Sequence, residues 1–112
     1  MVKTRRTLSP HATEAAVLLG HLVRKARIER KISTIDVAER AGISRGLLRR
    51  VEAGDPGCAI GTVFEVAAIV GVKLFDAEPA AISRAIATNR DLLTLLPKSI
   101  RLPKGEQVND DF

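Results

Sequence analysis

The sequence of 112 residues contains no tryptophan, no tyrosine, three phenylalanines and a single cysteine, Cys58. Proteins that bind single-stranded nucleic acid usually stack the bases on aromatic side chains, so the scarcity of aromatics argues against that class. A lone cysteine cannot form an internal disulfide, and no Cys/His cluster has the spacing of a zinc site. We therefore expect no metal and no other cofactor, and we expect a cytoplasmic protein.

Long hydrophobic runs are also missing. No stretch approaches the roughly 18 uninterrupted apolar residues of a membrane-spanning helix. The first residues, MVKTRRTLSPH, lack the apolar segment of a signal peptide. Membrane association is therefore not expected.

The usual catalytic constellations are absent as well. His11 and His21 have no carboxylate pair, nucleophile or glycine-rich phosphate loop near them in the sequence. Asp110 and Asp111 adjoin in a polar tail, which cannot hold catalytic geometry. We therefore expect that the protein is not an enzyme.

The positive charge is concentrated in one half of the chain. The net charge is +5. Residues 1–54 hold 12 basic and 5 acidic residues, a charge of +7, whereas residues 55–112 hold 6 and 8, a charge of −2. A basic N-terminal half indicates an anionic partner, although solubility alone is an alternative explanation for the excess.

The pattern of apolar residues, capping residues and glycines predicts an all-α protein of five helices. We expect a first helix from residue 10 or 11 to residue 31, and further helices over residues 34–41, 45–53, 60–70 and 79–95. The apolar stretch at 72–75 also fits a short strand, which would have to pair with another segment such as its copy in a second subunit. The predicted organisation is a basic arm over 1–10, a DNA-binding and dimerisation domain over 11–96, and a flexible tail over 97–112.

The first helix has two apolar stripes at helical spacing. Leu19, Val23 and Ala26 form one of them. The other stripe consists of Ala15, Leu18 and Leu22. It is a candidate dimer surface, and packing against a later helix of the same chain is an equally good interpretation.

The segment at 45–53 has the pattern of a recognition helix. Projected at 3.6 residues per turn, Leu47, Leu48 and Val51 lie on one side, and the opposite side holds Arg45, Gly46, Arg49 and Arg50. Arginine is the side chain best suited to bidentate contact with guanine in the major groove. Gly46 is costly within a helix, and close approach to a base or phosphate would justify it. The alternative is a merely solvated charged face.

The turn before this helix, and several hydroxyl and basic residues, agree with a DNA-binding interpretation. Ala38 suits a close helix crossing, and Gly42 suits the turn. Thr34, Ser44 and Thr62 lie at helix N-termini, where hydroxyl and N–H groups suit phosphate. Plain capping explains the threonines about equally well. The arm adds Lys3, Arg5 and Arg6, which are expected to contact the DNA backbone.

Four segments together resemble the lambda-repressor-like (Cro and XRE-type) helix-turn-helix family. They are LGHLVRKAR at 19–27, IDVAERAGIS at 35–44, LRRVEAG at 48–54 and GTVFEVAAIVG at 61–71. The resemblance implies a five-helix DNA-binding fold and a structural ion pair between Arg27 and Glu52. Two positions depart from the family pattern, because Thr34 stands where glutamine is common and Leu47 where a polar residue is common.

A narrower resemblance concerns GDPGCAIGTVFEVAAIVGVKL and the ending LLPKSIRLPKGEQVNDDF. Both are similar to HipB-like antitoxins, which are encoded beside HipA-type kinase toxins. This resemblance implies an autoregulating dimeric repressor of a palindromic double-stranded operator, and a tail (Asp110, Asp111 and Phe112) that docks on the kinase. The alternatives are a stand-alone XRE-type repressor and an adaptor protein that uses the fold without DNA.

Overall fold

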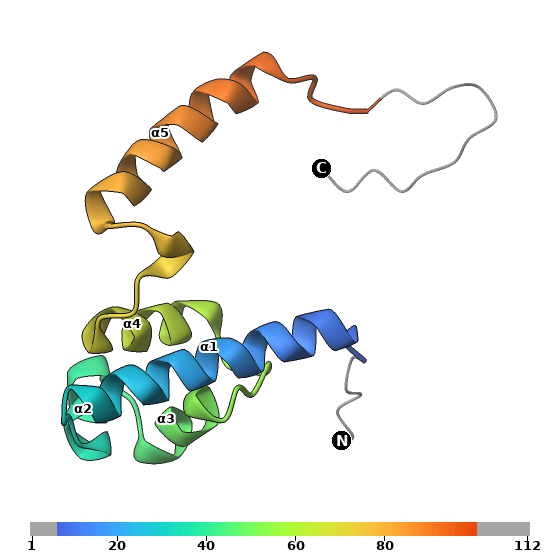
Figure 1. The fold of residues 1–112 in the computed structure, drawn as a ribbon. Coiled ribbons are helices and arrows are strands. Elements are labelled where there is room, and N and C mark those ends of the chain that lie inside the picture. The colour runs from blue at the N-terminus through green and yellow to red at the C-terminus, as the bar shows by residue number, and fades with distance from the viewer. Residues whose placement is uncertain (1–6, 101–112) are drawn as a thin grey trace. The chain divides into compact units, whose positions relative to one another are not determined.

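The computed structural model of the chain describes residues 7–100. This part contains five α-helices, one 3-10 turn and no strand. The elements are α1 (Pro10–Glu29), α2 (Thr34–Ala41), α3 (Arg45–Glu52), α4 (Ile60–Val70), η1 (Leu74–Asp76) and α5 (Pro79–Leu95) (Figure 1). The predicted all-α class is confirmed. No helix in this range is long and apolar enough to cross a lipid bilayer.

Serine side chains determine where the first three helices begin. The Oγ atoms of Ser9, Ser33 and Ser44 accept backbone hydrogen bonds of 3.2, 3.1 and 3.0 Å. Each donor is the N–H of the third residue after the serine, which would otherwise lack a partner within its helix. The predicted helix starts at residues 10, 34 and 45 are therefore confirmed.

Left-handed backbone conformations determine where several helices end. Gly42 and Gly71 terminate α2 and α4 with φ angles of 69° and 84°, which glycine adopts without steric cost. The predicted end of the first helix at Lys31 is wrong by two residues. Lys31 itself has a φ of 56°, so the helix cannot extend through it.

The predicted strand at 72–75 is also wrong. Leu74–Asp76 instead form a 3-10 turn. Phe75 and Asp76 have φ angles of 57° and 52°, which no β-strand contains. Val72 and Leu74 pack against the hydrophobic core, so this segment buries apolar surface without needing a second strand.

The chain forms two compact units, Met1–Asp76 and Ala77–Phe112. The first contains α1 to α4 and the 3-10 turn, and the second contains α5. The single domain that we predicted over 11–96 therefore spans parts of both units.

The hydrophobic core lies among α1, α2, α3 and α4. Its members are all shielded from solvent: Val23, Val37, Ala38, Leu48, Val51, Val66, Ala67 and Val70. In α1 the first predicted stripe lies toward this core, since Val23 is buried and Leu19 and Ala26 are half-buried. The second stripe (Ala15, Leu18 and Leu22) is exposed, and the exposed fraction of Leu18 is 59%.

Candidate nucleic-acid interface

Helix α3 is attached to the core by one side only. Leu48 and Val51 are buried, and Leu47 is half-buried. Residues on the other side of the helix, including Arg45, Gly46 and Arg49, are exposed. The apolar side thus anchors the helix and leaves a basic side toward solvent, as the helical projection predicted.

The three arginines of α3 differ in their surroundings. Arg45 and Arg49 have no ion-pair partner within residues 7–100. Arg50 instead pairs with Asp55, with 2.8 Å between its Nε and the Oδ2 atom. This hydrogen bond, together with the charge of Asp55, raises the pKa of Arg50. Arg45 and Arg49 are therefore the α3 arginines without a competing carboxylate, whereas a DNA phosphate would have to compete for Arg50.

Gly46 lies in the first turn of α3 with open space around it. A Cβ atom built there would come no closer than 3.8 Å to Ser44 Oγ. Its φ angle is an ordinary helical one, since the positive-φ glycines are Gly42, Gly54 and Gly71. No packing requirement of the described chain therefore explains this glycine. Its effect is to leave the backbone bare between the two outward arginines.

The angle between α2 and α3 depends on small residues at the turn. Ala38 is 3% exposed. The N–H of Gly42 donates to the carbonyl of Glu39 at 3.1 Å, and the N–H of Ile43 donates to that of Ala38 at 3.0 Å. These bonds close the end of α2 before Ser44 starts α3. The result is a short turn between two helices, closed by these two backbone hydrogen bonds.

An ion pair joins α1 to the end of α3. Arg27 Nε lies 2.6 Å from Glu52 Oε2, and Arg27 Nη2 lies 3.0 Å from Oε1, a bidentate arrangement. A third nitrogen, Nη1, donates to the carbonyl of Ile32 at 3.2 Å. The hydrogen bond to Glu52 raises the pKa of Arg27 although partial burial opposes this shift. The pair fixes where α3 ends relative to α1.

Two glycines that sequence reasoning missed bring α1 and the end of α3 into backbone contact. A Cβ at Gly20 would lie 2.7 Å from both Gly54 N and Val51 O. A Cβ at Gly54, whose φ is 75°, would lie 2.5 Å from Val17 Cα. The sequence did offer one indication of this contact. Gly20 lies in the middle of a strong helical pattern, and a glycine at such a position usually has a packing reason.

The remaining polar candidates lie at helix starts. Thr34 and Thr62 are both half-buried, in the first turns of α2 and α4. Ala59, the N-cap residue of α4, provides no side-chain cap, so the first N–H groups of this helix are not satisfied by the capping side chain. The Ser44 hydroxyl caps α3, and it still has a hydrogen to donate to a phosphate.

Several predicted residues lie outside the described part of the chain. Lys3, Arg5 and Arg6 belong to the arm, and Asp110, Asp111 and Phe112 belong to the tail. Their assignment to DNA and to a protein partner stays a prediction.

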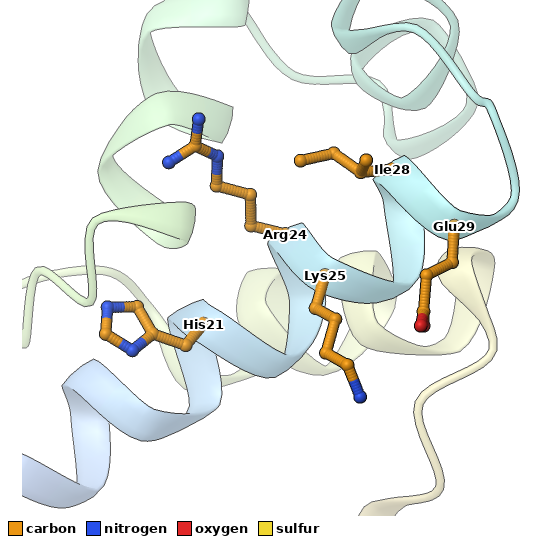
Figure 2. A pocket seen from close by; sticks show the side chains of 5 residues that line it. All are labelled: His21, Arg24, Lys25, Ile28 and Glu29. Atoms are coloured by element: carbon orange, nitrogen blue, oxygen red, sulfur yellow. The ribbon is translucent and has the colours of Figure 1, made fainter.

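A shallow hollow on α1 contains His21, one of the two histidines in the chain. Figure 2 shows its side chains, which all project from this one helix: His21, Arg24, Lys25, Ile28 and Glu29. Glu29 is the single carboxylate among them. Across residues 7–100, no three His, Cys, Asp or Glu side chains are grouped as metal ligands. The hollow lacks a carboxylate pair and a nucleophile.

Comparison with known families agrees with this geometry. Residues 23–76 match the family model described as "HTH_3: Helix-turn-helix". This segment is therefore similar to XRE-type helix-turn-helix domains. The match begins in α1 and ends with the 3-10 turn, so the matched segment contains the whole buried core together with α2 and α3. The family is one of DNA-binding transcription regulators. No curated protein matches the chain.

Proposed function

We propose that the protein is a sequence-specific transcriptional repressor that binds a palindromic double-stranded operator as a dimer in the cytoplasm. One observation carries this proposal. Arg45 and Arg49, four residues apart on the outward side of α3, have no carboxylate partner in the described chain. Residues at this spacing project together from a helix. A symmetric pair of such helices suits two successive major grooves.

The contacts fall into two classes by chemistry. Arg45 and Arg49 are the base-reading candidates, because a bidentate arginine–guanine contact discriminates by about 1–3 kcal/mol. Gly46 lets the helix backbone approach the duplex. Thr34, Ser44, Thr62 and Arg50 suit phosphates, as do Lys3, Arg5 and Arg6 in the arm, so these residues position the domain without reading sequence.

Two versions of the repressor differ in their protein partner. In the antitoxin version, the acidic residues Asp110 and Asp111 with Phe112 dock on a HipA-type kinase, and the protein represses its own operon. In the stand-alone version there is no kinase. A kinase-like reading frame beside this gene supports the antitoxin version, and its absence supports the stand-alone repressor.

The decisive experiment removes the two base-reading arginines. In Arg45→Ala/Arg49→Ala, operator affinity should fall at least about 30-fold, because two contacts of at least about 1 kcal/mol each are lost. The matched control, Arg84→Ala/Lys98→Ala, removes the same charge from the second unit and should leave affinity nearly unchanged. Fluorescence anisotropy with an operator selected from random duplexes measures both variants, and circular dichroism verifies that both remain folded.

The opposite result would favour a different class. If the folded arginine variant keeps its operator affinity, the protein is better described as an adaptor that uses the fold to bind proteins. Equal losses in the two variants would mean that net charge, and not α3, determines binding. The proposal includes no catalytic activity.

A further inference from the structure

Large apolar side chains of helix α5 are exposed to solvent. None of its 17 residues is buried. The exposed fractions of Ile86 and Leu93 are 54% and 65%, and that of Leu96, just beyond the helix, is 59%. Isolated apolar residues are common on protein surfaces, but a continuous row along one helix indicates a contact.

The row has the spacing of a coiled-coil seam. Successive positions are separated by four, three, four and three residues, and we call the row the α5 seam: Ile82, Ile86, Asn89, Leu93 and Leu96. Alternation of three and four residues is the a/d pattern of helices that pack along their whole length. Ile86, Asn89 and Leu93 also line one shallow depression on the helix surface. The seam therefore suits another straight helix more than an irregular surface.

The central residue of the seam, Asn89, indicates which helix packs against it. Asn89 donates from Nδ2 to the carbonyl of Ala85 at 2.8 Å, on its own helix. An asparagine among apolar residues costs stability unless the opposite position offers a polar group. In a parallel pair of identical helices, the residue opposite Asn89 is the Asn89 of the second copy. An arbitrary apolar partner would leave the amide facing hydrocarbon.

We propose that the α5 seam pairs in parallel with the same seam of a second copy of this chain. This assignment deepens the proposed function by locating the dimer contact, and it rests on that function only for the expectation of a dimer. In the parallel arrangement the charged flanking residue, Arg90, lies beside Ala85 of the other copy, so like charges do not meet.

The remaining chain offers no better occupant. Residues 101–112 contain three large apolar side chains, interrupted by Pro103 and Gly105. This is too few for the five layers of the seam, and proline interrupts a helix. The exposed α1 row of Leu18 and Leu22 is the competing intramolecular site, and the experiment must separate it from a second copy.

The length of the seam sets the expected strength. Ile82 and Leu96 are fourteen residues apart in the sequence, which corresponds to a rise of about 21 Å at helical spacing. Two heptads form a short contact, and isolated helices of this length are marginal in water. We therefore expect a dimer with a Kd in the micromolar range, which binding to a two-fold operator would strengthen.

Sedimentation equilibrium of the full chain without DNA tests the seam. The wild type should dimerise between about 1 and 100 µM, and Leu93→Asp should raise the Kd at least tenfold. The matched control is Leu95→Asp, because Leu95 is equally apolar, is 80% exposed and points away from the seam. It should leave the Kd within threefold of the wild type.

Charge exchange at the central position tests the pairing of Asn89 with itself. Asn89→Asp and Asn89→Lys should each raise the Kd at least tenfold, since like charges would face each other. An equimolar mixture should restore dimers, because the Asp and Lys variants face opposite charges. This rescue keeps the test valid even if Leu93→Asp unfolds α5, which the ellipticity at 222 nm reports.

Three results would overturn the assignment. They are a wild type that remains monomeric at 100 µM, equal effects of Leu93→Asp and Leu95→Asp, and charge variants that do not recover on mixing. The first result is the one expected if α5 packs on α1 of its own chain. Because no DNA is present, these results bear on the seam alone, and the arginine experiment on α3 tests DNA binding independently.

Discussion

At the scale of single residues, the contact between Arg27 and Glu52 contrasts with an exposed pair on α2. Arg27 and Glu52 are 13% and 8% exposed, whereas Arg40 and Asp36 are 54% and 44% exposed. A shielded pair has given up its hydration, so its stability depends on each partner being present. An exposed pair at i,i+4 contributes little. The two pairs therefore provide a matched comparison within one domain.

Glu52→Ala is expected to lower the free energy of unfolding by about 3 kcal/mol, because Arg27 would remain shielded without its carboxylate. Asp36→Ala should cost about 0.5 kcal/mol or less. Urea denaturation followed by circular dichroism measures both. Similar losses for the two variants would contradict the view that shielding gives the α1–α3 pair its importance.

The surroundings of Cys58 change the pKa of its thiol group. Burial raises the pKa of the thiol, and the charge of Arg50 partly opposes this. Because the thiolate is the reactive form, a raised pKa lowers its fraction at neutral pH. This half-buried cysteine is thus expected to be unreactive and to serve as a packed side chain.

At the scale of elements, two glycines within helices have opposite roles. Gly20 is buried where α1 touches the end of α3, and Gly46 is exposed in the first turn of α3. Glycine normally costs a helix up to about 1 kcal/mol relative to alanine. At Gly20 the close backbone contact offsets this cost. At Gly46 no described neighbour makes a contact that would offset it.

Gly20→Ala is expected to destabilise the protein by about 1–3 kcal/mol, since the added methyl group would overlap backbone atoms that cannot move aside. Gly46→Ala should keep or raise stability and should weaken operator binding, because the methyl group would stand between Arg45 and Arg49. Thermal melts and anisotropy distinguish these effects. A stable Gly20→Ala variant would show that α1 and α3 can separate.

The elements also indicate how far the sequence could predict this structure. Serine caps and terminating glycines are local signals, so most helix bounds and the outward face of Arg45 and Arg49 could be predicted. The strand at 72–75 was a wrong prediction because an apolar tetrapeptide carries no periodicity that separates a strand from a turn. The Gly20–Gly54 contact joins residues distant in sequence, and the pairing of Arg50 with Asp55 depends on the loop path, so neither was predicted.

At the scale of the whole molecule, basic and acidic residues are concentrated in different halves of the chain, and this separation bears on the proposed binding to DNA. The basic half, residues 1–54, contains the arm and helices α1 to α3, and the acidic half, residues 55–112, contains α4, the 3-10 turn, α5 and the tail. Each phosphate neutralised by a lysine or arginine releases a counterion, so affinity falls with salt. In the proposed dimer, about four such contacts from each copy would give roughly eight.

Operator affinity should therefore fall roughly 10³- to 10⁵-fold between 50 and 200 mM salt. Deleting residues 1–7 should weaken binding to all duplexes about equally and should reduce the slope of log K against log salt. Anisotropy titrations at four salt concentrations, with operator and scrambled duplexes, measure both effects. A flat salt response contradicts the backbone contacts, and a selective loss for the operator would mean that the arm reads bases.

Every residue of the hydrophobic core, including those packed at its border, lies between Val23 and Leu74. A truncated gene that stops after Asp76 would consequently still encode an intact interior. Replacing the C-terminal helix would thus leave the α1–α4 scaffold intact, so the proposed dimer contact could be altered without disturbing the hydrophobic core.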